Sequence, residues 1–102
     1  TFRRVVLACM AGFALSSPAA AADVAAGRAL AERWCAVCHN IEAGAPFKLR
    51  PPSFASIAVF RPPEDIRSKI ISPHIGMPDI TWTLQAEQIE DIEAYITSLE
   101  VK

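Results

Sequence analysis

The apolar residues of this 102-residue chain recur at spacings of three and four, and no stretch alternates between apolar and polar residues. Such spacing is typical of helices that bury one face, whereas alternation is typical of strands. A first helix is predicted from Asp23 to about Cys38, with Asp23 as its N-cap. Its apolar face comprises Leu30, Trp34 and Val37. The pattern therefore predicts an all-α chain.

The last predicted helix, from Gln85 to Leu99, has the clearest apolar stripe. Gly27 lies inside the first helix, where a glycine costs about 1 kcal/mol relative to alanine. A glycine at such a position suggests that another backbone crosses close by, and the last helix is the expected partner. The stripe of the last helix comprises Ile89, Ile92, Tyr95, Ile96 and Leu99, and Glu87, Glu90, Asp91 and Glu93 are expected to face water.

Prolines divide the middle of the chain into loops and short helices. Residues 40–52 and 72–82 are predicted as loops because proline and glycine gather there. Between these loops, one short helix is predicted from Ser53 to Phe60, and another from near Pro63 until Pro73 ends it. The residues expected to turn inward are Phe54, Ile57, Ala58, Phe60, Ile66, Ile70 and Ile71.

Residues 1–22 are predicted to be an export signal that is cleaved from the mature protein. Arg3 and Arg4 form a basic start, residues 5–15 are apolar, and small residues lead up to Ala22. The apolar run is too short to span a bilayer as a helix. Cleavage after Ala22 leaves residues 23–102 as one domain, and it removes Cys9.

The charge of this mature domain limits its partners. Removal of Arg3 and Arg4 leaves 8 Lys and Arg against 11 Asp and Glu, a net charge of about −3. A mildly acidic surface argues against nucleic acid or an anionic membrane as the partner. A domain of this size also needs a stabilising element beyond its apolar core, such as a covalently bound cofactor.

The segment Cys35-Ala-Val-Cys38-His39 carries the chemistry of the chain. A Cys-x-x-Cys-His run is typical of covalent haem attachment, in which two thiols bind the porphyrin vinyl groups and the histidine ligates the iron. On a helical turn these three side chains share one face. A structural zinc site needs four ligands, and His74 is the only further candidate. A thioredoxin-like dithiol should follow a strand, but the preceding residues are predicted as helix.

The sixth ligand of such an iron is the next question, and Met77 is the leading candidate. It is the only methionine of residues 23–102, and it lies in a loop stiffened by Pro73 and Pro78. A thioether is a soft donor that favours the reduced iron and suits an electron carrier. There are two alternatives: Met77 fills a gap in the core, or His74 ligates the iron in its place.

Together these features resemble the class I c-type cytochromes of the short bacterial monohaem kind. In that family the N- and C-terminal helices cross at a glycine, and short helices surround one haem. A proline carbonyl after the haem motif accepts the proton of the ligating histidine; the resemblance assigns this role to Pro51 or Pro52. It also implies that Phe54 packs on the haem. The matching segments are Gly27-Arg28, Cys35–His39, Pro51–Phe54, Met77-Pro78 and Ile92–Ile96.

Several positions depart from the family or have open roles. Ala31 replaces an aromatic residue of the first helix, so Trp34 or Tyr95 must supply its bulk. Trp82 either donates its indole N–H to a haem propionate or packs in the core. Three basic residues either pair with a haem propionate or lie solvated on the surface: Lys48, Arg50 and Arg61.

These observations predict a periplasmic one-electron carrier with haem c, His39/Met77 ligation and no enzymatic activity. Expected partners are a dehydrogenase or reductase as donor and an oxidase or another cytochrome as acceptor, without nucleic acid or a membrane anchor. The protein is expected to be a monomer or a subunit of a complex. The alternatives are a cytochrome subunit of a larger dehydrogenase, and a haem enzyme or gas sensor with an open or His74-ligated sixth position.

Overall fold

A computed structural model describes residues 21–47, 50–72 and 76–100. The predicted export signal falls almost wholly outside these described residues. Lys48, Pro73 and His74, which the sequence singled out, lie outside them as well.

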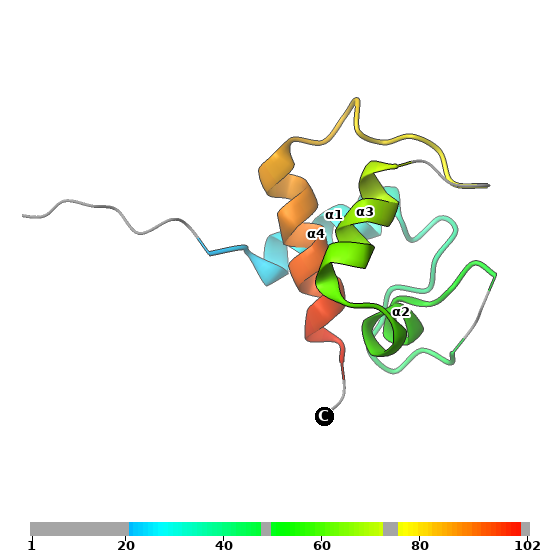
Figure 1. Ribbon diagram of the computed structural model, residues 1–102. Helices are drawn as coiled ribbons and strands as arrows, with labels where there is room; N and C mark the ends of the chain where they lie inside the picture. The colour runs from blue at the N-terminus through cyan, green and yellow to red at the C-terminus, as the bar shows by residue number, and fades with distance from the viewer. Residues whose placement is uncertain (1–20, 48–49, 73–75, 101–102) are drawn as a thin grey trace, which may run out of the picture.

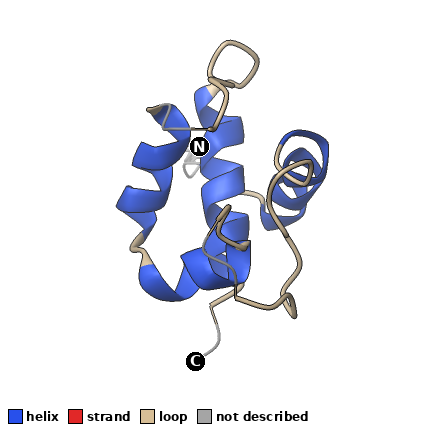
Figure 2. Cartoon of the chain, turned by 90° about the vertical axis from the view of Figure 1, so that its right-hand side faces the viewer, coloured by secondary structure: helices blue, strands red, loops and turns tan. Residues whose placement is uncertain are grey.

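Four helices and no strand are found in the described residues, as Figures 1 and 2 show. They are α1 (Val24–Trp34), α2 (Phe54–Phe60), α3 (Pro63–Ile71) and α4 (Ala86–Ser98). The prediction of an all-α chain is confirmed. None of these helices is long and apolar enough to cross a membrane, a statement that covers the described residues alone.

The crossing of α1 and α4 organises the fold, and the two helices overlap at the centre of Figure 1. A Cβ atom placed on Gly27 would overlap the backbone carbonyl of Asp91 and come within 3.0 Å of the Tyr95 Cβ. Only a residue without a side chain permits this close approach. The predicted crossing at Gly27 is confirmed.

Local capping explains why the helices begin where they do. The Asp23 and Ser53 side chains accept the amide protons of Ala26 and Ser56, at 3.0 and 3.2 Å. Gln85 forms a reciprocal capping box with Gln88 at the start of α4. These caps place the beginnings of α1, α2 and α4 within one residue of their predicted positions.

The end of α1 differs from the prediction, because the helix stops at Trp34 and not near Cys38. The amides of Cys35 and Ala36 both donate to the carbonyl of Ala31, at 2.8 and 2.9 Å. Sharing one acceptor widens the last turn and ends the regular α-helical hydrogen-bond pattern. The predicted haem motif, Cys35–His39, therefore lies on a separate turn that follows α1.

The core fills the space between α1, α3 and α4, where Ile92 is 1% exposed and Ala31 is fully buried. Tyr95 is buried in the same cluster as Ala31, and Trp34 is half-buried against it, so both aromatic residues add bulk to this core. The phenol of Tyr95 donates a 2.7 Å hydrogen bond to the carbonyl of Ile41. Burial first, and then the nearby Glu42 carboxylate, raise the pKa of this phenol.

Four apolar residues are more exposed than predicted. Val37, which was predicted on the apolar face of the first helix, is 84% exposed because α1 ends at Trp34 and Val37 lies on the turn that follows. Phe60 is 66% exposed because it ends α2 and packs edge-on against Phe47, with ring centroids 5.9 Å apart, outside the core. Ile71 is 42% exposed because it is the last residue of α3. Trp82 is 89% exposed, so the alternative of core packing for this residue is wrong.

Candidate functional site

A crevice runs between the haem motif, α2, α3 and the loop that precedes α4. It consists of adjoining cavities of about 250 and 780 Å³, which share Cys35, His39, Pro52, Met77 and Ile80 among their described lining residues. The smaller cavity is called the inner cavity below, and the larger one the outer cavity. The inner cavity has an apolar wall, which favours a large apolar ligand. This wall is formed by Phe54, Ile57, Ile66, Ile70, Ile92 and Ile96.

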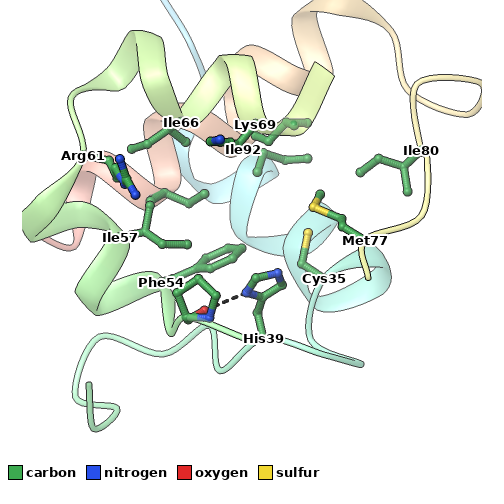
Figure 3. A pocket seen from close by; sticks show the side chains of 13 residues that line it. Cys35, His39, Phe54, Ile57, Arg61, Ile66, Lys69, Met77, Ile80 and Ile92 are labelled. Carbon is green, nitrogen blue, oxygen red and sulfur yellow. Dashed lines mark hydrogen bonds between the residues drawn. The ribbon is translucent and has the colours of Figure 1, made fainter. Parts of the chain in front are cut away.

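The turn after α1 places both cysteines and the histidine at this crevice. The amides of Cys38 and His39 donate to the carbonyl of Cys35, at 3.1 and 2.8 Å. Cys35 is buried and Cys38 is exposed, and neither forms a disulfide. Burial raises the pKa of the Cys35 thiol to about 11. Figure 3 shows the Cys35 sulfur and the His39 ring directed into the same space.

One hydrogen bond fixes the tautomer of His39. Its Nδ1 atom lies 2.7 Å from the carbonyl oxygen of Pro52. A carbonyl oxygen can only accept, so Nδ1 carries the proton and Nε2 keeps a free lone pair. Phe54 packs beside the imidazole, with ring centroids 5.5 Å apart. The contact partner is therefore Pro52 and not Pro51.

Met77 comes to the crevice from the loop between α3 and α4. Gly76, with φ of +84°, turns the backbone just before it, and Met77 is half-buried against the core. Beyond it, the Asp79 carboxylate accepts the amide and hydroxyl protons of Thr81, at 2.9 and 2.6 Å. These hydrogen bonds lower the pKa of Asp79 and hold the turn that follows Met77. In Figure 3 the Met77 sulfur faces the space beside Cys35.

Comparison with known proteins identifies the family of the chain that forms this crevice. The family described as cytochrome C oxidase, cbb3-type, subunit III matches residues 22–96. The chain belongs to this family of c-type cytochromes. It is also 43% identical over 89 residues to cytochrome c-552 of Bradyrhizobium diazoefficiens, a similarity that covers 82% of each chain. No solved structure shows a significant match.

This cytochrome is thus an electron-transfer protein and not an enzyme, and its family carries covalently bound haem c. Such proteins exchange electrons with redox partners. The residues of the crevice fit a haem: an apolar wall, two adjacent thiols and a histidine whose Nε2 is free for iron. Met77 adds a soft donor to the same space.

Basic side chains of the cytochrome also reach the crevice. Arg50 lines the outer cavity, whereas Arg61 and Lys69 line the inner one. Arg61 also pairs with Asp65 at 3.6 Å. Sequence reasoning missed Lys69, although its position three residues after the inward-facing Ile66 places it on the same side of α3.

Among the candidate site residues that the structure describes, Trp82 is the one that does not reach the crevice. It lies in a turn just before α4 and does not belong to the described lining of either cavity. Ile80, two residues earlier, is buried and lines both cavities instead. Ile80 was not a predicted site residue, although an isoleucine three residues after Met77 was available as a signal.

Proposed function

We propose that this cytochrome is a periplasmic one-electron carrier whose single haem c is bound to Cys35 and Cys38 and ligated by His39 and Met77. The observation that carries the proposal is the shared crevice, because all four residues line it. A haem held there supplies the reversible exchange of one electron between its ferric and ferrous forms.

The residues around the crevice have distinct roles in this proposal. The carbonyl of Pro52 holds the Nδ1 proton of His39, and so it orients the ring and makes Nε2 a better electron donor to the iron. Phe54 prevents the ring from turning by packing on it. The apolar wall excludes water, and the neutral thioether of Met77 favours the reduced state.

Arg50, Arg61 and Lys69 give the crevice three cationic side chains. A haem carries two propionate groups, whose negative charges these residues can offset. All three side chains belong to exposed residues, so each contributes modestly and in a salt-dependent way. A contact between Trp82 and a propionate is not supported, because Trp82 does not line the described part of either cavity.

Electrons are proposed to leave at the side of the crevice that carries Cys38. Cys38 is exposed, and its neighbour Val37 is 84% exposed. An uncharged edge with Arg50 close by suits a small, short-lived contact with another redox protein. The periplasmic location rests on the predicted export signal at residues 1–22.

A fixed subunit of a larger redox enzyme is the second candidate. Two observations favour it: the exposed aromatic pair of Phe47 and Phe60, and the family description, which names a subunit of an oxidase. Purification from the native host under mild conditions distinguishes the two. A free carrier elutes at the mass of one chain, whereas a subunit elutes with its complex.

A redox titration of the purified protein tests the proposed carrier function, with spectra taken in the presence and absence of carbon monoxide. A carrier titrates as a single one-electron couple, and its ferrous form does not bind carbon monoxide readily because both axial positions are filled. Rapid carbon monoxide binding would instead indicate an open sixth position, as in a gas sensor or haem enzyme.

A further inference from the structure

A backbone hydrogen bond connects the start of α1 to the middle of α4. The nitrogen of Asp23 donates a 2.8 Å hydrogen bond to Oδ1 of Asp91. The Asp23 carboxylate itself is engaged elsewhere, because it caps α1 at the amide of Ala26. In the full-length chain this nitrogen belongs to the peptide bond with Ala22.

An acidic groove lies beside this contact. A cavity of about 360 Å³ is lined by Ala22 and by charged side chains of α3 and α4. Its only cationic lining residue in the described part is Arg67, which lies 3.5 and 3.8 Å from two of its carboxylates. The charged residues of the groove are Glu64, Arg67, Glu90 and Glu93. Negative charge therefore exceeds positive charge where Ala22 meets Asp23.

We propose that the export signal is cleaved between Ala22 and Asp23, and that the α-ammonium group so formed binds the carboxylate of Asp91. The reaction is a hydrolysis by a signal peptidase. The C–N bond between Ala22 and Asp23 breaks, one water molecule supplies the second oxygen of the new Ala22 carboxylate, and the two protons of that water pass to the Asp23 nitrogen, which becomes an ammonium. The proposal rests on the export part of the proposed function.

Cleavage changes the strength of the contact without moving its atoms. A neutral amide donor becomes a cation, and a hydrogen bond between two charged groups is stronger than one with a neutral partner. A cation at the start of a helix is opposed by the helix dipole, and the carboxylates of Asp23 and Asp91 offset this. Because Asp23 is exposed, we expect the ion pair to shift the folding equilibrium by roughly twofold to fivefold.

The contact between Asp23 and Asp91 lies close to the residues that hold α1 and α4 together and line the crevice. Asp23 is one helical turn before Gly27, the crossing point with α4, and Asp91 precedes Ile92, which lines the inner cavity. Removal of the signal thus strengthens the contact between α1 and α4, and α4 contributes to the wall of the crevice.

The first test identifies the mature N-terminus. The holoprotein is exported from the full-length chain, purified, and analysed by N-terminal sequencing and intact mass. The proposal requires Asp23 as the first residue, and any other first residue overturns it. Recovery of the uncleaved chain also contradicts the export part of the proposed function.

The second test measures the pKa of the α-amino group from the titration of the Asp23 ¹³Cα shift between about pH 6 and pH 10. Asp91 and the acidic groove should raise this pKa above the ordinary value of about 8, and Asp91→Asn should lower it. Glu100→Gln removes an equal charge beyond the end of α4 and serves as the matched control. An unchanged pKa in Asp91→Asn overturns the pairing while leaving the cleavage site intact.

The wild-type protein alone provides a further check, which does not depend on the folding of any variant. Added salt should lower the α-amino pKa toward its ordinary value, because the pair is exposed to solvent. The stability from a raised pKa is complete below about pH 8 and is lost as the pH rises through the folded-state value. An ordinary pKa at low salt overturns the pairing.

Discussion

The Nδ1 atom of His39 lies 2.7 Å from the carbonyl oxygen of Pro52, and this contact links the haem motif to the start of α2. The amide of Phe54 donates to the carbonyl of Asn40 at 2.8 Å, which holds the same two segments together. The orientation of the imidazole is therefore determined by the backbone of a segment 13 residues further along the chain.

Replacing Pro52 tests this relationship. Pro52→Ala frees the backbone angle that aims the carbonyl, so the hydrogen bond weakens and the imidazole donates less electron density. We expect the reduction potential to rise by an amount on the order of tens of millivolts. Pro46→Ala, an exposed proline of the same loop, is the control. Equal shifts in both variants would contradict the assigned role.

Gly27 provides a test of the helix crossing. In Gly27→Ala the new Cβ overlaps the backbone of Asp91, so α1 and α4 must separate. We expect a loss of about 2–4 kcal/mol in the free energy of unfolding, measured by denaturant titration. Gly44→Ala is the matched control, because no atom lies within 4 Å of its Cβ position. A similar loss in both variants would show that the crossing is not the cause.

Tyr95 should make stability depend on pH in the alkaline range. Burial first, and then Glu42 with a smaller contribution from Glu32, raise the phenol pKa, whereas Arg28 opposes the shift. The unfolded chain thus loses this proton first, above about pH 10. The stability is complete below that pH and is lost as the pH rises through the folded-state pKa.

Tyr95→Phe is expected to remove this alkaline slope. It should also cost about 1–2 kcal/mol at neutral pH, because the carbonyl of Ile41 loses its phenol partner. The free energy of unfolding, measured from neutral to alkaline pH, checks both effects. A slope that persists in Tyr95→Phe would have to come from another group.

Lys69 is expected to tune the reduction potential. A positive charge beside the crevice disfavours the ferric form, which carries one more positive charge than the ferrous form. Lys69→Gln should therefore lower the potential by about 10–50 mV, and the shift should shrink at high salt. Arg67→Gln serves as the control, because Arg67 lies in the acidic groove away from the crevice. Equal shifts would mean that only net charge matters.

Local signals account for the parts of the fold that the sequence predicted well. The caps at Asp23 and Ser53 and the proline at Pro63 each act within a few residues, so these three helix starts could be placed. The last helix was predicted from its apolar stripe, and the capping box at Gln85 was found only in the structure. The helix crossing at Gly27 was predictable because glycine destabilises the interior of a helix, and a close approach of another backbone explains its presence there. The fixed spacing of Cys35, Cys38 and His39 predicted a haem attachment site, and the structure brings these three residues to one crevice.

Features that depend on the exact hydrogen bonds and ends of the helices, or on contacts between segments, could not be predicted. The end of α1 depends on two amides that share the Ala31 carbonyl, which no residue pattern reveals. Phe60 and Ile71 fit an apolar stripe, but each is the last residue of its helix and is partly exposed. Pro52 could be separated from Pro51 only by the position of its carbonyl relative to His39.

The central claim is that His39 and Met77 ligate the same iron, and the near-infrared spectrum of the ferric protein tests it most directly. We predict low-spin iron with the weak methionine–iron charge-transfer band, which Met77→Ala abolishes while the haem stays attached. Ile71→Ala, a partly exposed residue at the end of α3, should keep the band. A wild-type spectrum without the band, or a band that survives in Met77→Ala, would contradict the ligation and with it the proposed mode of electron transfer.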